Sequence, residues 1–147
     1  MLDVQTYTRL VRWSAVYDFV VTAPFATPWS FALLVTVLRN LDSALGLPGS
    51  IEAPQGLALL MGNLMGSLVL VWSVARYRLS LRVLGRYDAF ARFLFALWQI
   101  YALIGGISWV VLPFLAAEIG IGIAQSLPIS SGLTGRQPPA PARPPSR

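Results

Sequence analysis

The chain has 147 residues, of which 56% are hydrophobic and 12% are charged, and its formal net charge is +5. Soluble globular domains usually contain about 25% charged residues, so this composition excludes a water-soluble surface and predicts an integral membrane protein. The chain has no Cys and no His, and every basic residue is Arg. These absences exclude disulfides, Cys or His zinc sites, His-ligated haem and Schiff-base lysines, and we predict no cofactor and no metal site.

The arginines lie beside apolar segments, which is the pattern that places basic residues on the cytoplasmic side of a membrane. A nucleic-acid surface would need a basic groove with interleaved aromatic residues, and the sequence has none, so we predict no nucleic-acid partner. The use of Arg without Lys, together with abundant Ala, Gly and Pro, is typical of a GC-rich bacterial genome. We therefore expect the bacterial inner (cytoplasmic) membrane.

The first apolar region, residues 13–38, is too long for one perpendicular span, since about 20 helical residues cross the apolar core of a bilayer. Pro24 and Pro28 interrupt it, and a proline removes a backbone donor and clashes with the preceding helical turn. The simplest interpretation is a first span over about residues 9–23, followed by a break and a second helix.

That second helix is predicted over about residues 28–45. Thr27 is a suitable N-cap, Pro28 occupies the first helical position, and Gly46 follows the last turn. The polar residues share one face and the apolar residues lie opposite, which favours a helix in the interface on the outer side of the membrane over a helix that crosses it. The polar face consists of Thr36, Arg39, Asn40 and Ser43.

A cleaved signal peptide is a competing interpretation of the N-terminus, with Arg9 and Arg12 as its basic region and residues 13–21 as its apolar region. Asp18 inside the apolar region argues against it. Pro24, close before the one suitable cleavage position, argues against it as well. We expect the first segment to be retained.

Three further spans follow from the lengths of the remaining apolar segments. Residues 57–75 contain no charge and predict the second span, and the arginine-rich segment after it is expected in the cytoplasm. Residues 88–128 would extend about 60 Å as one helix, which is twice the apolar thickness, so a turn is required. Residues 105–108, with the sequence GGIS, are the best candidate, and the predicted spans are then 88–104 and 109–127.

The predicted fold is therefore an all-α membrane protein, in which residues 1–127 form a bundle of four transmembrane helices with an additional interfacial helix. Four spans place both termini in the cytoplasm, whereas three spans would export a basic tail and stay an open alternative. Residues 128–147 hold six of the eleven prolines and predict a disordered cytoplasmic tail. In size and topology alone the chain resembles small bacterial bundles of the DoxX-like kind, and the resemblance carries over no residue and no activity.

Small residues recur at four-residue spacing in the second and fourth spans. Such faces let helix backbones approach closely in membranes, so we expect these two helices to pack through them, within one bundle or with a second chain. The two faces consist of Ala58, Gly62 and Gly66, and of Ala116, Gly120 and Ala124.

Asp18 and Glu118 lie in the middle of predicted spans, where a charged side chain costs about 2.5–3.5 kcal/mol on insertion scales. Counted from the cytoplasmic ends of their spans, both acids fall in one layer. Each of the four spans offers a polar group near this layer, and we predict an intramembrane polar site there. Its candidate members are Tyr17, Asp18, Asn63, Arg92, Gln99 and Glu118.

Two interpretations of this layer stay open. It is either a proton-relay or ligand-binding site, or a structural network in which Arg92 or Arg12 neutralises an acid. The arginine-rich segment carries a second candidate contact, to lipid headgroups, which topology determination alone explains equally well. The candidate headgroup residues are Arg76, Arg78, Arg82 and Arg86.

The sequence contains no phosphate loop, no nucleophile elbow and no acid paired with a catalytic base, so an enzyme is not indicated. We predict a non-catalytic accessory or assembly subunit of a larger bacterial inner-membrane complex, with the lipid bilayer and a membrane protein or a second copy of the chain as partners. The alternative is a small transporter or a lipid- or quinone-binding protein that uses Asp18 and Glu118. An integral membrane enzyme is the third interpretation.

Overall fold

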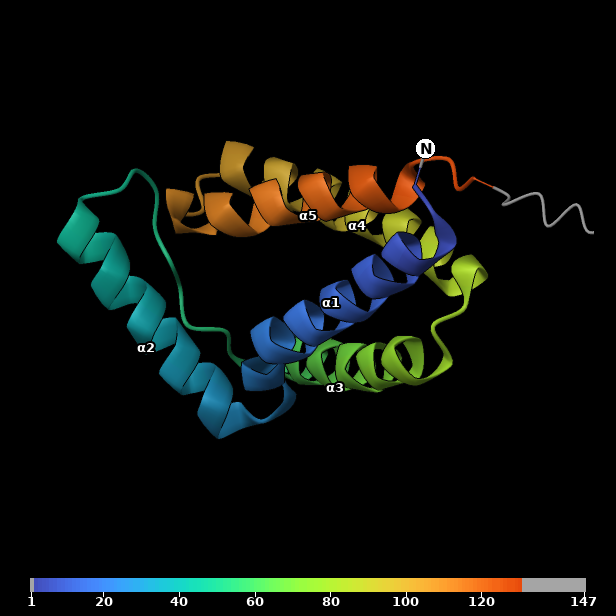
Figure 1. Ribbon diagram of the computed structural model, residues 1–147. Helices are drawn as coiled ribbons and strands as arrows, with labels where there is room; N and C mark the ends of the chain where they lie inside the picture. The colour runs from blue at the N-terminus through green and yellow to red at the C-terminus, as the bar shows by residue number, and fades with distance from the viewer. Residues whose placement is uncertain (1, 131–147) are drawn as a thin grey trace, which may run out of the picture.

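The computed structural model describes residues 2–130, and within that range the chain is helical apart from its connecting segments (Figure 1). The predicted all-α class is confirmed. The order of elements is α1 (Val4–Thr22), the 3-10 helix η1 (Ala23–Ala26), α2 (Pro28–Leu45), α3 (Gly56–Leu79), α4 (Arg82–Ile104), the 3-10 helix η2 (Trp109–Val111) and α5 (Leu112–Ser126).

The helices form two packed pairs and one projecting arm. α1 packs along α3, α4 packs along α5, and α1 also touches both α4 and α5. Figure 1 shows α2 extending away from the other helices, with a long connecting segment that returns from its far end to α3. Only Val35 of α2 is buried, so most apolar side chains of this helix lie on the surface.

The chain bends by 106° between α1 and α2. Pro24 lies in η1 and Pro28 begins α2, so the two missing backbone donors fall where helical hydrogen bonding is interrupted. The Thr27 hydroxyl accepts a hydrogen bond from the Ser30 amide at 3.3 Å, and Gly46 ends α2 in the left-handed conformation with φ 58°. The N-cap and the C-terminal glycine predicted for this helix are confirmed.

The small-residue faces of α3 and α5 have different neighbours from those expected. α3 packs on α1 and η1, and α5 packs on α4, so the predicted pairing of α3 with α5 is wrong within this chain. The bend after α1 fills the α3 face: a Cβ atom on Gly66 would lie 2.7 Å from the Phe25 backbone, and one on Gly62 would lie 2.5 Å from the Phe31 ring. A Cβ atom on Gly120 would meet no atom of the described residues within 4 Å.

The turn between α4 and η2 ties α2 to the bundle, and it coincides with the predicted turn at residues 105–108. Ser108 is fully buried. Its hydroxyl accepts a hydrogen bond from the Val110 amide at 3.1 Å and donates one to the carboxylate of Asp42, near the end of α2. The Ser108 amide donates to the Ser50 carbonyl at 3.1 Å, so the connection between α2 and α3 is fixed at the same place.

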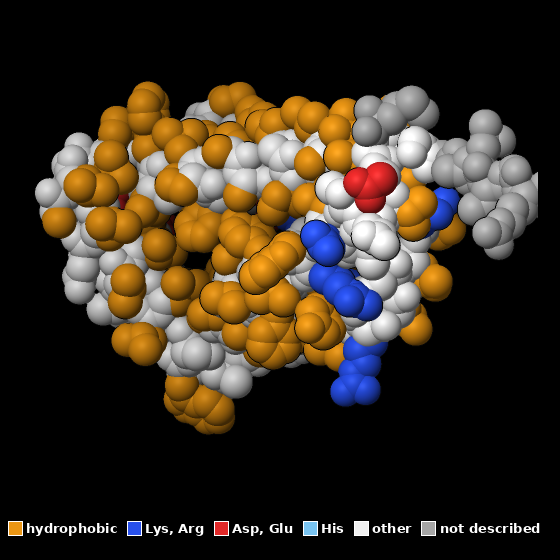
Figure 2. Space-filling view, viewed as in Figure 1, with side chains coloured by type: hydrophobic (Ala, Val, Ile, Leu, Met, Phe, Trp, Pro, Cys, Tyr) orange, Lys and Arg blue, Asp and Glu red, His pale blue; other side chains and the backbone are white. Residues whose placement is uncertain are grey.

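Two helices of the described chain, Gly56–Leu79 and Trp109–Ser126, are long and apolar enough to cross a membrane, and a third crossing is counted if Val4–Ala26 and Pro28–Leu45 together form one. Figure 2 shows apolar side chains over most of the visible surface and arginines gathered toward one end. These features are consistent with a membrane location. α4 is not among the candidate spans, and its first half carries four charged residues, Arg82, Arg86, Asp88 and Arg92.

The two ends of the described chain lie side by side (Figure 1). The Leu2 amide donates to the Pro128 carbonyl at 2.9 Å, and the Ser130 amide donates to the Leu2 carbonyl at 2.8 Å. Residues 128–130, which the sequence assigns to a disordered tail, are therefore paired with the start of the chain. The remainder of that predicted tail, residues 131–147, lies outside the described residues.

Asp3 begins α1 as its N-cap. Its carboxylate accepts hydrogen bonds from the Thr6 amide at 2.8 Å and from the Thr6 hydroxyl at 2.6 Å. These bonds favour the ionised form, with the hydroxyl contact as the larger effect, and they lower the pKa of the Asp3 carboxyl.

Candidate functional site

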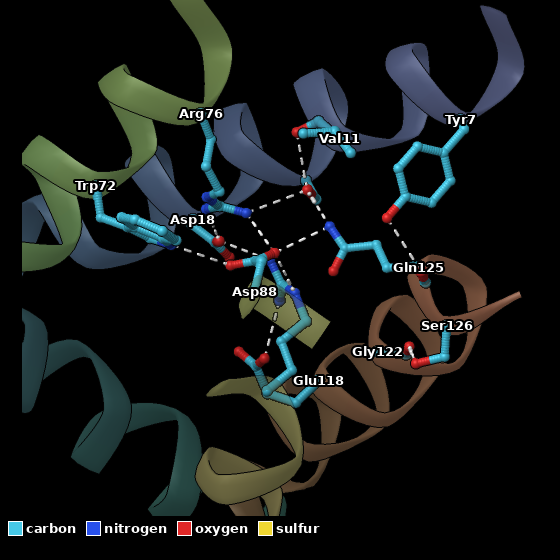
Figure 3. Close-up of polar contacts among 12 residues, drawn as sticks. Tyr7, Val11, Asp18, Trp72, Arg76, Asp88, Glu118, Gly122, Gln125 and Ser126 are labelled. Atoms are coloured by element: carbon cyan, nitrogen blue, oxygen red, sulfur yellow. Dashed lines mark hydrogen bonds and ion pairs between the residues drawn. The ribbon is translucent and has the colours of Figure 1, made fainter. Parts of the chain in front are cut away.

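Charged side chains from four helices meet inside the bundle, and Figure 3 shows their polar contacts. α1 contributes Asp18, α3 contributes Arg76, α4 contributes Asp88 and Arg92, and α5 contributes Glu118. Asp88 and Arg92 share one face of α4 because residues four apart are neighbours along a helix. Arg76 is 0% exposed and Arg92 is 1% exposed, so the cluster lies in the core. We refer to these five residues as the charge network.

Arg76 binds two carboxylates at once. Its Nη2 pairs with Asp18 and its Nη1 with Asp88, and Nη1 also donates to the Ser14 hydroxyl at 3.3 Å. The guanidinium lies 5.9 Å from the ring centroid of Trp72, whose indole nitrogen donates to Asp88 at 3.3 Å. A buried guanidinium is tolerated only when acids and hydrogen bonds compensate its desolvation, and here both are present.

Arg92 binds all three acids. Its Nη2 lies 2.6 Å from Asp18 Oδ2, its Nε lies 3.1 Å from Asp88 Oδ2, and its Nη1 lies 2.8 Å from Glu118 Oε2. Asp18 and Asp88 therefore each bridge two arginines, whereas Glu118 contacts one. The side chains of Asp18 and Glu118 are 11% and 13% exposed, against 4% for Asp88, so Asp18 and Glu118 form the accessible edge of the network.

Neutral groups extend the charge network toward the paired chain ends. The Gln125 side-chain amide donates to Asp88 at 2.9 Å and to the Ser14 hydroxyl at 2.8 Å. The Tyr7 hydroxyl donates to the backbone carbonyl of Gln125 at 3.2 Å. These contacts join α1 to α5 as well as to α4, so one connected set of polar contacts links four helices.

Some buried polar atoms beside these contacts have no hydrogen-bond partner among the described residues. Within the network itself this is the Nε of Arg76, and next to it the Oε1 of Gln125. Ser73, one turn before Arg76 on α3, has an unpartnered hydroxyl. Ordered water is the usual partner of such groups in protein interiors. These atoms are therefore the expected positions of buried water molecules.

The charge network contains three carboxyl groups and two guanidinium groups, which leaves one surplus negative charge when all five are ionised. Within residues 2–130 no group of three or more acidic, His or Cys side chains is arranged to hold a metal ion. The arrangement is suited to joining the four helices.

The structure brings three of the six predicted polar-layer residues into direct contact, namely Asp18, Arg92 and Glu118. Asn63 and Gln99 each have a buried amide oxygen without a partner among the described residues. No hydrogen bond joins Tyr17, Asn63 or Gln99 to the charge network in the described part of the chain. Of the two arginines considered as partners for an acid, Arg92 has this role, while Arg12 donates to the Ser80 hydroxyl at 2.8 Å.

Arg76 is not on the lipid-headgroup surface that was predicted for the arginine-rich segment. It is fully buried, because α3 turns it inward onto Asp18 and Asp88, and the headgroup assignment is wrong for this residue. Arg78 and Arg82 are exposed, so a headgroup contact stays a prediction for them. Arg86 is also exposed, and it donates two hydrogen bonds to carbonyl groups at the end of α5, where a cation is favourable.

Sequence reasoning missed Arg76, Asp88, Ser14 and Gln125 as members of one polar cluster. One signal was available: Asp88 and Arg92 stand four residues apart on a predicted helix, which is the spacing of a helical ion pair. Ser14 and Gln125 carry no such signal. Their hydrogen bond joins residues at the two ends of the described chain, and only the packing of α1 on α5 reveals it.

We compared the sequence with protein-family models and with curated proteins, and the structure with solved structures, and no match was found in any of the three comparisons.

Proposed function

We propose that this protein is a non-catalytic accessory or assembly subunit of a larger bacterial inner-membrane complex. The observation that supports this proposal is the uncovered small-residue face of α5. Ala116 and Gly120 are exposed, and space is open beside Gly120. In membranes such a face lets a second helix approach closely, and within this chain it is Gly122 of α5 that lies against Phe93 and Arg92 of α4. A helix of a partner protein, or of a second copy, is the expected occupant.

The charge network supports a role without catalysis. Its carboxyl and guanidinium groups bind one another, so each is already engaged in holding helices together. Groups that act as general acids or bases need a position from which they reach a substrate, and the two arginines are closed off from the surface. The network is best explained as a clamp that holds the bundle in one arrangement.

The proposed topology has four spans, with the N- and C-termini in the cytoplasm and α2 in the interface on the outer side. Arg9 and Arg12 lie in the first half of α1, and Arg78 and Arg82 lie at the turn from α3 to α4. The hydrogen bond of Arg12 to Ser80 brings these two regions together. The positive-inside rule associates such a grouping of basic residues with the cytoplasm. Because the natural chain has no Cys, single cysteines at Leu2, at Arg82 and at the exposed Glu52 between α2 and α3 can be labelled with a reagent that does not cross the membrane. Labelling of Glu52→Cys from outside and of the other two from inside is expected. Labelling of Leu2→Cys and Arg82→Cys from opposite sides would contradict four spans.

The experiment that tests the subunit role is native purification of the full chain in mild detergent, with identification of co-purifying proteins. A stable larger partner is expected with the natural chain. Gly120→Ile fills the open face and is expected to release the partner without lowering the unfolding temperature, whereas the matched variant Gly120→Ala is expected to retain it. Purification of the natural chain without any protein partner or second copy would contradict the proposal.

The second candidate function is a small transporter or a lipid- or quinone-binding protein that works at the Asp18 and Glu118 edge. The surplus carboxyl group and the partial exposure of these two side chains favour it, because an accessible, uncompensated acid in a membrane is a common proton or ligand site. Asp18→Asn and Glu118→Gln that express normally but abolish activity of the host complex would support this candidate. Retained activity in both variants would leave the subunit role.

A further inference from the structure

A groove runs along the outer surface between α1 and α3, on the side of these helices that the charge network does not use. Its first part has a volume of about 290 Å³. Apart from Ser73 and Arg78, the residues that line it are apolar or aromatic. They are Ala15, Val16 and Phe19 from α1, and Ser73, Val74, Tyr77 and Arg78 from α3.

A second hollow, of about 240 Å³, continues the groove away from Arg78. It shares Phe19 and Val74 with the first part and adds Leu70 and Val71, which lie one turn further along α3. The two parts together give an elongated apolar channel that is open along its length. We refer to it as the α1–α3 groove.

Cationic side chains stand at one end of the α1–α3 groove. Arg78 lines the groove and is exposed. Arg12 precedes Ala15 by one turn of α1, and its Nε is held by the Ser80 hydroxyl at 2.8 Å, directly after the end of α3. Its two terminal nitrogens take part in no hydrogen bond among the described residues. Tyr77, beside Arg78, has the amphipathic ring that is common at membrane–water interfaces.

We infer that the α1–α3 groove binds a phospholipid with an anionic headgroup, whose phosphate lies at Arg78 and Arg12 and one of whose acyl chains follows the groove past Phe19 and Val74. The charge at one end and the apolar surface along the rest match the two parts of such a molecule. A guanidinium binds phosphate through two parallel hydrogen bonds, and apolar side chains bury methylene groups favourably. A partner helix matches the groove less well, since it would leave these arginines without an anion.

The test uses the purified full chain and two lipids with identical acyl chains, phosphatidylglycerol and phosphatidylcholine, with binding measured by native mass spectrometry. The natural chain is expected to bind phosphatidylglycerol more tightly, by about fivefold per basic residue that contacts the headgroup. Arg78→Gln is expected to remove about fivefold of this preference. Arg39→Gln removes the same charge from α2, which does not line the groove, and is expected to leave the preference unchanged.

A second pair of variants tests the groove itself. Val74→Trp fills its centre, and Val71→Trp fills its far part in case the first variant fails to fold. Either is expected to weaken binding of both lipids, because it blocks the acyl chain rather than the headgroup. Equal effects of Arg78→Gln and Arg39→Gln would overturn the inference in favour of diffuse attraction. Unchanged binding in the folded Trp variants, or a second copy of the chain in place of lipid, would overturn it as well.

Discussion

Asp18 and Glu118 are held by the two terminal nitrogens of one guanidinium group, that of Arg92, at 2.6 and 2.8 Å. The first acid comes from α1 and the second from α5, so a single arginine on α4 fixes the positions of two other helices. Asp18 is held a second time by Arg76 of α3. The contribution of each member to stability therefore depends on how many partners it leaves unpaired when it is replaced.

Arg92→Gln is expected to destabilise the protein strongly. It removes one cation from three acids and leaves Glu118 with none, and removing one partner of a buried ion pair typically costs about 3–5 kcal/mol. Thermal unfolding in detergent, followed by circular dichroism, measures the effect. Arg82→Gln, which changes an exposed arginine of the same helix, is the control and is expected to change stability by about 0.5 kcal/mol or less. Similar unfolding temperatures for the two variants would show that the charge network does not hold the bundle.

Asp18→Asn is expected to cost more stability than Glu118→Gln. Asp18 bridges both arginines, whereas Glu118 binds only Arg92. The Glu118 variant leaves two acids for two cations and still offers an oxygen to Arg92, so a change of about 1 kcal/mol or less is expected, in the range of one ordinary hydrogen bond. The unfolding temperatures of both variants decide the order. The reverse order would show that the single contact of Glu118 holds the helices more strongly than the two contacts of Asp18.

Gly66→Ala is expected to destabilise the fold by about 1–3 kcal/mol, the usual cost of overpacking. Its Cβ atom would lie 2.7 Å from Phe25 and 2.8 Å from the Ala26 amide nitrogen, and these are contacts with backbone that cannot rotate away. Gly120→Ala is the matched control, because the space beside it is open among the described residues. Equal unfolding temperatures for the two variants would show that Gly66 of α3 is not in close contact with the backbone of η1.

Asp3 is expected to add a small pH dependence to stability. Hydrogen bonds with Thr6 lower the pKa of the Asp3 carboxyl in the folded protein. The stabilisation is therefore fully present above the carboxyl's unfolded pKa of about 3.9. It is lost as the pH falls through the lower pKa of the folded protein. Asp3→Asn keeps an N-cap side chain but does not titrate. The difference in unfolding temperature between the natural chain and this variant should therefore shrink below about pH 4. A difference that stays constant from pH 6 to pH 3 would contradict this cause.

The features of the fold that depend on local chemistry could be predicted from the sequence. Thr27, Pro28 and Gly46 act through their own backbone or that of the next turn, so their roles need no knowledge of the other helices. Counting residues along each predicted span places Asp18 and Glu118 at a similar position, and in the structure both contact Arg92; their depth in a membrane stays a prediction.

The features that depend on helix rotation and on the choice of neighbour could not be predicted in this way. Arg76 and Arg78 stand two residues apart in one basic segment, yet two residues turn a helix by about 200°. One arginine therefore faces the acids and the other the surface. Likewise, the spacing of Gly62 and Gly66 identifies a face that admits close approach, but it does not say that η1, rather than α5, occupies that face.

The pairing of Leu2 with Pro128 and Ser130 bears on how many times the chain traverses the bilayer. Two segments joined by backbone hydrogen bonds lie in the same aqueous compartment, and a path that leaves a compartment and returns to it makes an even number of passages. The candidate crossings are α3, Trp109–Ser126 and the bent first segment, and the proposed four-span topology predicts that α4 is the fourth. Its charged residues Asp88 and Arg92 do not oppose this, since both are turned inward and neutralised by partners on neighbouring helices.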